Sequence, residues 1–270
     1  MKRLAALSGL TLTLCALACA QEAAGDRVVV PARSTSHPRV VKCSTTFGAI
    51  VVKTYNGREV VIETRPSGAT SRAPQTFEGL KRIDLPRGLE VTEEDNVITV
   101  RPSPLHRGQV VVTVPPDTSL QLNGTHGSIT VDGVHGDVQA ETTHADIVLT
   151  NVSGTVLANT THGNVKATMD RVDPSKALSF TTVHGDIDVT LPDDAKANVK
   201  MSSVQGSIYS DFEIRIGGGQ PITEKSDTAD ARFRLRIDRT ITGAINGGGS
   251  EVSLRTVHGR ILLRRKSGVK

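Results

Sequence analysis

Aromatic residues are scarce in this sequence, and tryptophan is absent. Two tyrosines and five phenylalanines are the only aromatic side chains among 270 residues. Any hydrophobic core must therefore be built from aliphatic side chains, which favours many thin layers over one bulky centre. The chain also lacks the aromatic platforms on which enzymes usually hold a sugar. Apolar residues still make up 37% of the chain, and 25 glycines accompany them, so disorder throughout is excluded.

Neither sign of charge dominates. The chain has 32 Lys and Arg against 28 Asp and Glu, a formal charge of +4. Removing Lys2 and Arg3, which lie in a segment that we expect to be cleaved, leaves 30 basic residues against 28 and a charge of +2. This balance does not indicate a general polyanion binder, and we expect no nucleic-acid partner.

Only the N-terminus carries a long uncharged, mostly apolar run. Leu4–Leu17 follows a short basic start and precedes the small residues Ala18 and Ala20, a pattern typical of a secretory signal peptide. No later segment approaches the roughly 20 apolar residues that a membrane span needs. We therefore expect a signal peptide at 1–20, a tether at 21–38 and one β-solenoid domain at 39–266, located in the periplasm, at the cell surface or outside the cell.

Cysteine is also scarce, with three residues in the chain. Cys19 offers an alternative to simple cleavage, because bacterial lipoproteins are cleaved just before a cysteine that is then acylated. Cleavage after Ala20 instead leaves Cys43 alone, which excludes an intrachain disulfide. Cys43 lies in the strand-like segment Val40–Cys43, so we interpret it as a small buried hydrophobe rather than a reactive thiol.

A nine-residue repeat organises the middle of the chain. Five units follow one another without a gap from Thr125 to Met169: THGSITVDG, VHGDVQAET, THADIVLTN, VSGTVLANT and THGNVKATM. Alternate units match best, so the structural period is about 18 residues. Each unit has apolar residues two apart, which places them on one face of a short strand. The pattern predicts an all-β fold, a single-stranded parallel β-solenoid (β-helix) with about 18 residues per coil.

Sequence outside the central repeats fits the same fold. The motif returns near Val183, Val204 and Val257, and the turn at 173–176 can hold the four extra residues between His162 and His184. Upstream, short segments with period-two character predict strands at 51–54, 59–63, 89–92, 97–101 and 110–114. Residues 66–76 are expected to form a loop.

These features together resemble a known type of protein. Val114–Asp117 leads into repeated His-Gly units, and Gly243–Gly249 is followed by Thr256–Ile261 near the end of the chain. This combination resembles the bacterial adhesin-like families of the head-GIN type. The resemblance implies an extracytoplasmic β-solenoid without an established biochemical role. One departure is that histidine stands before the repeat glycine, where such proteins commonly have asparagine.

Six of the eight histidines occupy that one motif position: His126, His135, His144, His162, His184 and His258. One hypothesis is structural, because a coil corner can require positive φ, which histidine tolerates better than most residues. A second is a metal site. With 18 residues per coil, His126, His144 and His162 form a column at about 4.8 Å spacing, which His184 continues, and neighbouring imidazoles could bind Zn, Ni or Cu. A third is pH sensing by stacked imidazoles.

Other functions remain as alternatives. Calcium-binding β-rolls also have nine-residue repeats, but they carry more glycines per unit than this chain. β-Helices host polysaccharide-acting enzymes, yet no nucleophile, metalloprotease or phosphate-loop motif is present. Arg232–Ile237 alternates arginine with apolar residues and could bind an anionic envelope polymer or protect a strand edge. We predict a non-catalytic, adhesin-like protein with no cofactor, which binds or scaffolds an unidentified protein or anionic glycan of the cell envelope. One alternative is a metal-binding or pH-sensing protein that uses the histidines. The other is a polysaccharide-acting enzyme.

Overall fold

The computed structural model describes residues 26–32, 38–65, 88–104, 106–216 and 240–266. All regular structure in these residues is β-strand, which confirms the all-β prediction. Within them, no helix is long and apolar enough to cross a membrane. The expected signal peptide with Cys19, the expected loop at 66–76 and the alternating segment Arg232–Ile237 lie outside the described residues.

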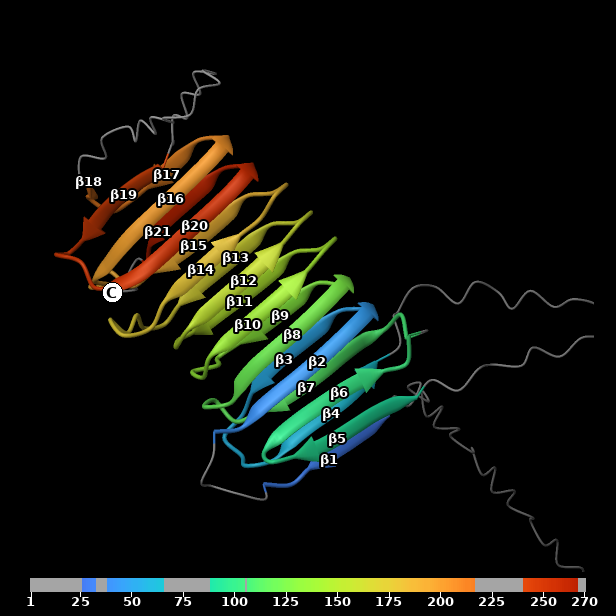
Figure 1. Ribbon diagram of the computed structural model, residues 1–270. Helices are drawn as coiled ribbons and strands as arrows, with labels where there is room; N and C mark the ends of the chain where they lie inside the picture. The colour runs from blue at the N-terminus through green and yellow to red at the C-terminus, as the bar shows by residue number, and fades with distance from the viewer. Residues whose placement is uncertain (1–25, 33–37, 66–87, 105, 217–239, 267–270) are drawn as a thin grey trace, which may run out of the picture.

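The strands form two facing sheets that extend along the whole molecule (Figure 1). Sheet A has ten strands, in spatial order β1 (Arg27–Val30), β4 (Val60–Arg65), β7 (Gln109–Val114), β3 (Ile50–Thr54), β9 (Ile129–Asp132), β11 (Ile147–Val152), β13 (Val165–Met169), β15 (Ile187–Leu191), β21 (Ile261–Arg265) and β17 (Ile208–Ser210). Sheet B has eleven, in spatial order β18 (Arg215–Ile216), β19 (Thr240–Ile245), β16 (Ala197–Gln205), β20 (Ser250–His258), β14 (Leu178–Thr181), β12 (Val156–Thr160), β10 (Val138–Thr142), β8 (Ser119–His126), β2 (Val40–Phe47), β6 (Val97–Pro102) and β5 (Leu89–Glu94).

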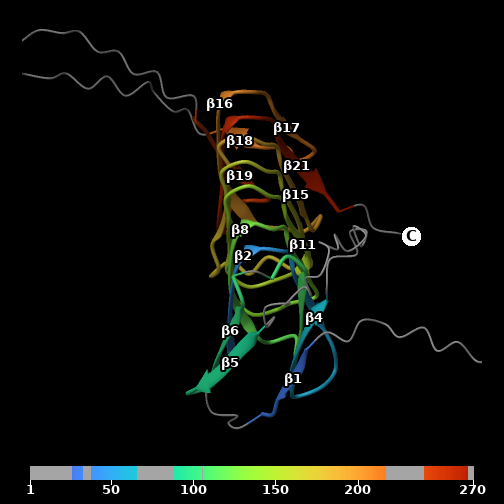
Figure 2. The same cartoon turned by 90° about the vertical axis from the view of Figure 1, so that its right-hand side faces the viewer.

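Each central coil supplies one strand to sheet B and the next to sheet A, as the side view shows (Figure 2). Neighbouring strands are parallel and in register at a spacing of 18 residues, with Val138 opposite Val156 and Ile129 opposite Ile147. The next coil is longer, since Val156 lies opposite Leu178, and its extra residues form the turn at 173–176. The parallel solenoid and its 18-residue coil are therefore confirmed.

The core is the thin space between the two sheets. Alternate residues of every central strand point into it, and Ile129, Ala140, Ile147 and Leu149 are at most 1% exposed. Among the largest fully buried side chains of the described residues, Phe180 is the one aromatic residue and the others are Ile, Leu and Met. The core is therefore mostly aliphatic, as the composition predicts. Each buried Val, Leu or Ile contributes roughly 1.5–3 kcal/mol relative to an exposed one. Stacking of such layers holds the outer side chains at coil spacing.

Both ends of the solenoid depart from the parallel pattern. At the N-terminal end β1 pairs with β4, β4 with β7 and β5 with β6, all antiparallel. At the other end β19 pairs antiparallel with both β16 and β18. The expected tether at 21–38 is wrong for Arg27–Val30, because these residues add an edge strand to sheet A. A short edge strand of this kind gives little periodic signal in sequence.

The C-terminal coil does not stack where the chain order would place it. Strands β20 and β21 lie between the β14–β15 coil and the β16–β17 coil, so that Leu178 faces Val252 and Val252 faces Val199. The repeat motif identifies each coil but contains no information about its neighbour. This insertion brings the motif at Val257 next to the one at Val183.

The glycine-rich segment near the C-terminus forms the turn from β19 to β20. Asn246, Gly247 and Gly248 have φ values of 48°, 87° and 85°, a left-handed run that glycine adopts without steric cost. The Asn246 amide nitrogen donates to the backbone oxygens of Asp193 and Ala195 at 3.1 and 2.9 Å. These bonds fix the turn against the loop before β16.

Candidate functional site

Five of the six repeat histidines form one column on the corner where the chain passes from sheet B to sheet A. Their ring centroids are 4.8, 5.2, 4.8 and 4.7 Å apart and the ring planes differ by at most 7°, in the order His126, His144, His162, His184 and His258. The predicted column of His126, His144 and His162, continued by His184, is confirmed. His258 joins it because β20 and β21 are inserted beside β14 and β15. We call these five residues the histidine column.

An aromatic residue and a cation close one end of the histidine column. Phe47 stacks on His126 with 5.3 Å between ring centroids, and the Arg107 guanidinium lies 5.0 Å from the centre of the Phe47 ring. Contacts of both kinds are favourable. Sequence reasoning missed Phe47, although Phe47-Gly48 precedes Ile50 as His-Gly does in the repeats. At the other end Gln205 takes the motif position opposite His258.

The corner backbone corrects one expectation. The four described non-glycine residues with positive φ are Asp95, Asn96, Asn151 and Asn246, and no repeat histidine is among them. The hypothesis that histidine stands at the corner because it tolerates positive φ is therefore wrong. The following glycine has a different role, since a Cβ on Gly185 would collide with the backbone oxygen of Gly163. Close approach of neighbouring backbones thus requires glycine at Gly185, and it places the preceding histidines at coil spacing.

Threonines inside the corner bind the same backbone. The hydroxyl groups of Thr160, Thr182 and Thr256 donate to the corner carbonyl oxygens of Ala145, Gly163 and Gly185 at 2.9 to 3.1 Å. These hydroxyls are in buried or nearly buried positions, where an unpaired polar group is costly. The bonds join the end of each sheet B strand to the corner of the adjacent coil.

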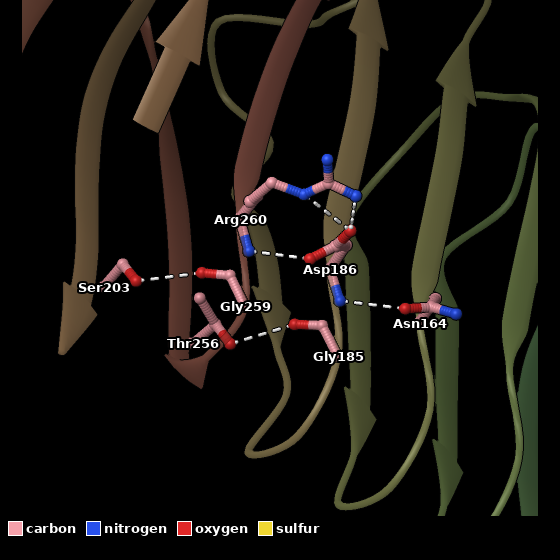
Figure 3. Close-up of polar contacts among 7 residues, drawn as sticks. All are labelled: Asn164, Gly185, Asp186, Ser203, Thr256, Gly259 and Arg260. Carbon is pink, nitrogen blue, oxygen red and sulfur yellow. Dashed lines mark hydrogen bonds and ion pairs between the residues drawn. The ribbon is translucent and has the colours of Figure 1, made fainter. Parts of the chain in front are cut away.

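A second column of polar residues lies two residues beyond the histidines, at the start of the sheet A strands. Asp146 accepts a bond from the backbone N–H of Asn164 at 2.6 Å, and Asn164 accepts one from the N–H of Asp186 at 2.9 Å. Asp186 accepts from the N–H of Arg260 at 2.7 Å and from its guanidinium at 2.6 and 3.1 Å (Figure 3). We call Asp146, Asn164 and Asp186 the Asp/Asn column. Each of its side chains accepts a hydrogen bond that joins one coil to the next.

Electrostatics agree with that structural role. The Arg260 guanidinium, through its hydrogen bonds and charge, holds the pKa of Asp186 below its usual range against the opposing effect of partial burial. At the opposite corner, burial raises the pKa of Asp137, but bonds from Thr155 and Lys176 outweigh it and the net shift is downward. The pKa of Asp173 is also lowered, first by the hydrogen bond from the backbone N–H of Ser175 in the same turn. The shifts at all three carboxylates are therefore explained by contacts within the fold.

The histidine column differs because its ring nitrogens have no partner among the residues that the structure describes. All five side chains are exposed, and no hydrogen bond or ion pair among the described residues involves their imidazole nitrogens. An imidazole always carries one N–H donor and one further site that accepts or donates. A row of such groups remains open to solvent or to a ligand.

Metal binding by His126, His144, His162 and His184 stays a prediction, and the stack constrains it. Imidazole nitrogens bind a metal in the ring plane at about 2.0–2.1 Å, and in near-parallel rings those directions run side by side without converging. Within the described residues, no group of three or more His, Cys, Asp or Glu is placed to hold a metal ion. Two neighbouring rings would have to rotate out of the stack to share one.

A shallow polar groove of about 300 Å³ runs beside the histidine column on the sheet B side. It crosses the coils of β8, β10 and β12. Its lining consists of hydroxyl, amide and carboxylate groups at repeated positions: Asn123, Glu141, Asn159, Thr143 and Thr161, with Gly124, Thr142 and Thr160 below them. Hydrogen-bonding groups therefore flank the histidines over three coils.

The sixth repeat histidine does not belong to this site. His135 lies at the other corner, where sheet A passes to sheet B between β9 and β10, and its backbone N–H donates to the oxygen of Pro116. Its side chain is exposed, and no ring stacking with it occurs among the described residues. Histidines at the same motif position therefore lie in two different structural environments.

Cys43 is a core residue. It lies in β2 with no exposed surface, and burial raises the pKa of its thiol to about 12. A thiol that stays protonated is a poor nucleophile. The interpretation of Cys43 as a small buried hydrophobe is confirmed.

Comparison with known proteins identifies the class to which this stacked architecture belongs. The family model described as Toastrack DUF4097 matches residues 105–264, which include the central repeats, all five stacked histidines and the inserted C-terminal coil. The chain belongs to this family of unknown function. The head-GIN type in particular stays a prediction.

Two further comparisons add little. None of the curated proteins matches this chain. One similar solved structure is that of a candidate cell adhesion protein from Clostridium sporogenes, with 9% sequence identity, coverage of 90% of this chain and 100% of that chain, and a TM-score of 0.45. A likeness of this size carries no argument for a shared function.

Proposed function

We propose that this chain is a non-catalytic, extracytoplasmic protein that binds or scaffolds a component of the cell envelope or surface. The observation that carries the proposal is repetition. The same polar groups recur at coil spacing along one corner and the adjacent groove, on a backbone held rigid by stacked core layers. Stacked-repeat proteins use such extended regular surfaces for binding. The sequence pattern at 1–20 supports export.

The described ionisable groups also fit this proposal. Catalysis usually needs carboxylates, thiols or imidazoles whose pKa values are shifted toward their task. Here the shifts at Asp137 and Asp186 come from bonds that join coils, and the raised pKa of Cys43 comes from burial in the core. These groups therefore serve the fold.

Two measurements test the proposal. Mass spectrometry of the mature protein from its source organism should find an N-terminus at Gln21 or an acylated Cys19, whereas intact Met1 on cytosolic protein would contradict export. The purified mature chain should also cosediment with isolated cell envelopes. Reproducible turnover of an envelope glycan, abolished by Glu141→Gln in the groove, would instead identify an enzyme.

A further inference from the structure

From the open histidine column and its groove, we propose a binding site for a linear anionic polysaccharide that is occupied when the histidines are protonated. This rests on the proposed function and names the chemical class of the partner. The first step is the row of free imidazoles. Five rings spaced 4.7 to 5.2 Å apart present N–H groups that no described residue uses.

Protonation determines the charge of this surface. The charged side chains within three residues of a column histidine are Glu141, Asp146, Asp186, Arg255 and Arg260. Arg107 joins them at the end of the column, over the Phe47 ring. Arg260 is paired with Asp186, Asp146 accepts a backbone N–H, and Glu141 accepts from the Gln139 amide at 3.0 Å. Because these groups balance, the column itself decides the sign. Histidine normally changes charge between pH 5 and 8.

Stacked positive charges favour an extended anion. Neighbouring imidazolium rings about 5 Å apart repel one another, and negative groups placed along the row relieve that repulsion. A single small anion reaches one or two rings, whereas a polymer with one carboxylate per sugar reaches the whole row. Charge-assisted hydrogen bonds from imidazolium to carboxylate are the strong kind.

The groove favours a sugar polymer over other polyanions. Asn123, Thr143 and Asn159 line it and offer amide and hydroxyl groups that suit sugar hydroxyls. They lie beside the first three histidines of the column, so one chain can contact both. The near-neutral charge balance of the whole chain does not favour general attraction of polyanions over its surface.

The test uses the mature chain and fluorescently labelled polygalacturonate, a linear polyuronate, at about pH 5.5 and about pH 8. We expect binding to be at least about tenfold tighter at the lower pH, as for other electrostatic contacts. The double variant His144→Gln/His162→Gln should lose roughly tenfold or more of the affinity at the lower pH. Glutamine suits the position, since Gln205 already occupies it in the last coil. Unchanged affinity of the double variant would overturn the proposal.

A matched control and two other polymers complete the design. His135→Gln removes a repeat histidine at the opposite corner and should leave the affinity unchanged; an equal loss there would show general charge attraction and overturn the proposal. Neutral dextran should not bind. Polyphosphate, which has charge without sugar, should bind more weakly than polygalacturonate, and equal binding would overturn the assignment to a polysaccharide. Cosedimentation of the double variant with envelopes, but no binding of polygalacturonate by the wild type, would remove this inference while the proposed function stands.

Discussion

Two columns of polar side chains lie on either side of one corner position, which is occupied by Ala145, Gly163 and Gly185 in successive coils, and the two columns have different roles in the fold. The Asp/Asn column accepts the backbone N–H groups of the next coil, as Asp186 does for Arg260 at 2.7 Å. The histidine column stacks ring on ring, and its nitrogens bond to none of the described residues. Polar groups that join coils are structural, whereas exposed polar groups repeated without a partner are where binding can occur.

The histidine column also shows that histidine does not stand at the corner for the reason that would apply to asparagine. The head-GIN type of protein, which the sequence resembles, commonly has asparagine where this chain has the corner histidines. A shared tolerance of positive φ would explain both residue types. The corner histidines have no such φ, so backbone geometry does not select them. What remains is the property that asparagine lacks, an aromatic ring whose charge changes with pH.

The largest expected effect comes from removing the support beneath both columns. Ile147→Ala should lower the free energy of unfolding by about 2–4 kcal/mol, because Ile147 is fully buried and a cavity remains. Thr150→Ala, three residues along the same strand on the outer face, should cost under about 1 kcal/mol. Chemical denaturation measures both. Equal losses would contradict the assignment of inner and outer faces.

A moderate effect on stability should distinguish the two columns at Asp186 and His184, which lie on either side of Gly185. Asp186→Ala should cost about 1 kcal/mol, because the Arg260 N–H and guanidinium lose their acceptor at a partly exposed site. His184→Gln, on the other side of Gly185, should change stability by less than about 0.5 kcal/mol near neutral pH. Thermal melts of the two variants give the comparison. A more damaging His184→Gln would show that the stack holds the fold.

The Asp/Asn column should also show its role in acid. The pKa of Asp186 is lowered in the folded protein, so its ionised form stabilises the fold above its unfolded pKa of about 3.9. This contribution is lost as the pH falls through the lowered folded value. Asp186→Asn keeps the acceptor for the N–H but loses the charge, so its stability should approach that of the wild type as the pH falls. Urea melts from about pH 6 to about pH 3 test this. A gap that stays constant with pH would contradict it.

A small effect tests the backbone of the histidine corner. His144→Val should change stability by under about 1 kcal/mol near neutral pH, because the corner backbone accepts a β-branched residue when φ is not positive. His144→Asn should be equally tolerated. A large loss of stability with valine and none with asparagine would support the hypothesis that the corner histidines have positive φ.

The smallest effect concerns metal. Because the stacked rings do not converge, adding Zn should leave the melting temperature of the wild type close to its value with chelator, whereas a specific ligand would raise it by mass action. His144→Asn provides the matched control. A Zn-dependent rise in the wild type that the variant lacks would show that the rings leave the stack to bind metal.

Much of the fold could be predicted from the repeat. Apolar pairs two apart identify the inward face, and the match of alternate units gives the 18-residue coil that aligns Val138 with Val156. The position of β20 and β21 could not be predicted, because any coil with the same inward pattern can stack on any other. Strand β1 could not be predicted either, because a strand of four residues gives too little periodic signal.

The candidate site could be predicted in part. The spacing places His126, His144 and His162 in one column, and it also separates His135, since that residue lies half a coil away. It does not show ring orientation, so the parallel stack and its free nitrogens follow only from the structure. Phe47 was missed because its motif lies before the continuous repeats, in the coil that begins with β2.

The most direct test of the contrast between the columns is an NMR titration of the imidazole nitrogens with polygalacturonate at about pH 5.5. We predict that the ¹⁵N signals of the five column histidines shift together, while those of His135 and the backbone amides of Asn164 and Asp186 stay in place. Shifts that are as large at His135, or signals of the column that do not respond, would contradict the claim that this fold keeps one column for its own stability and leaves the other free to bind.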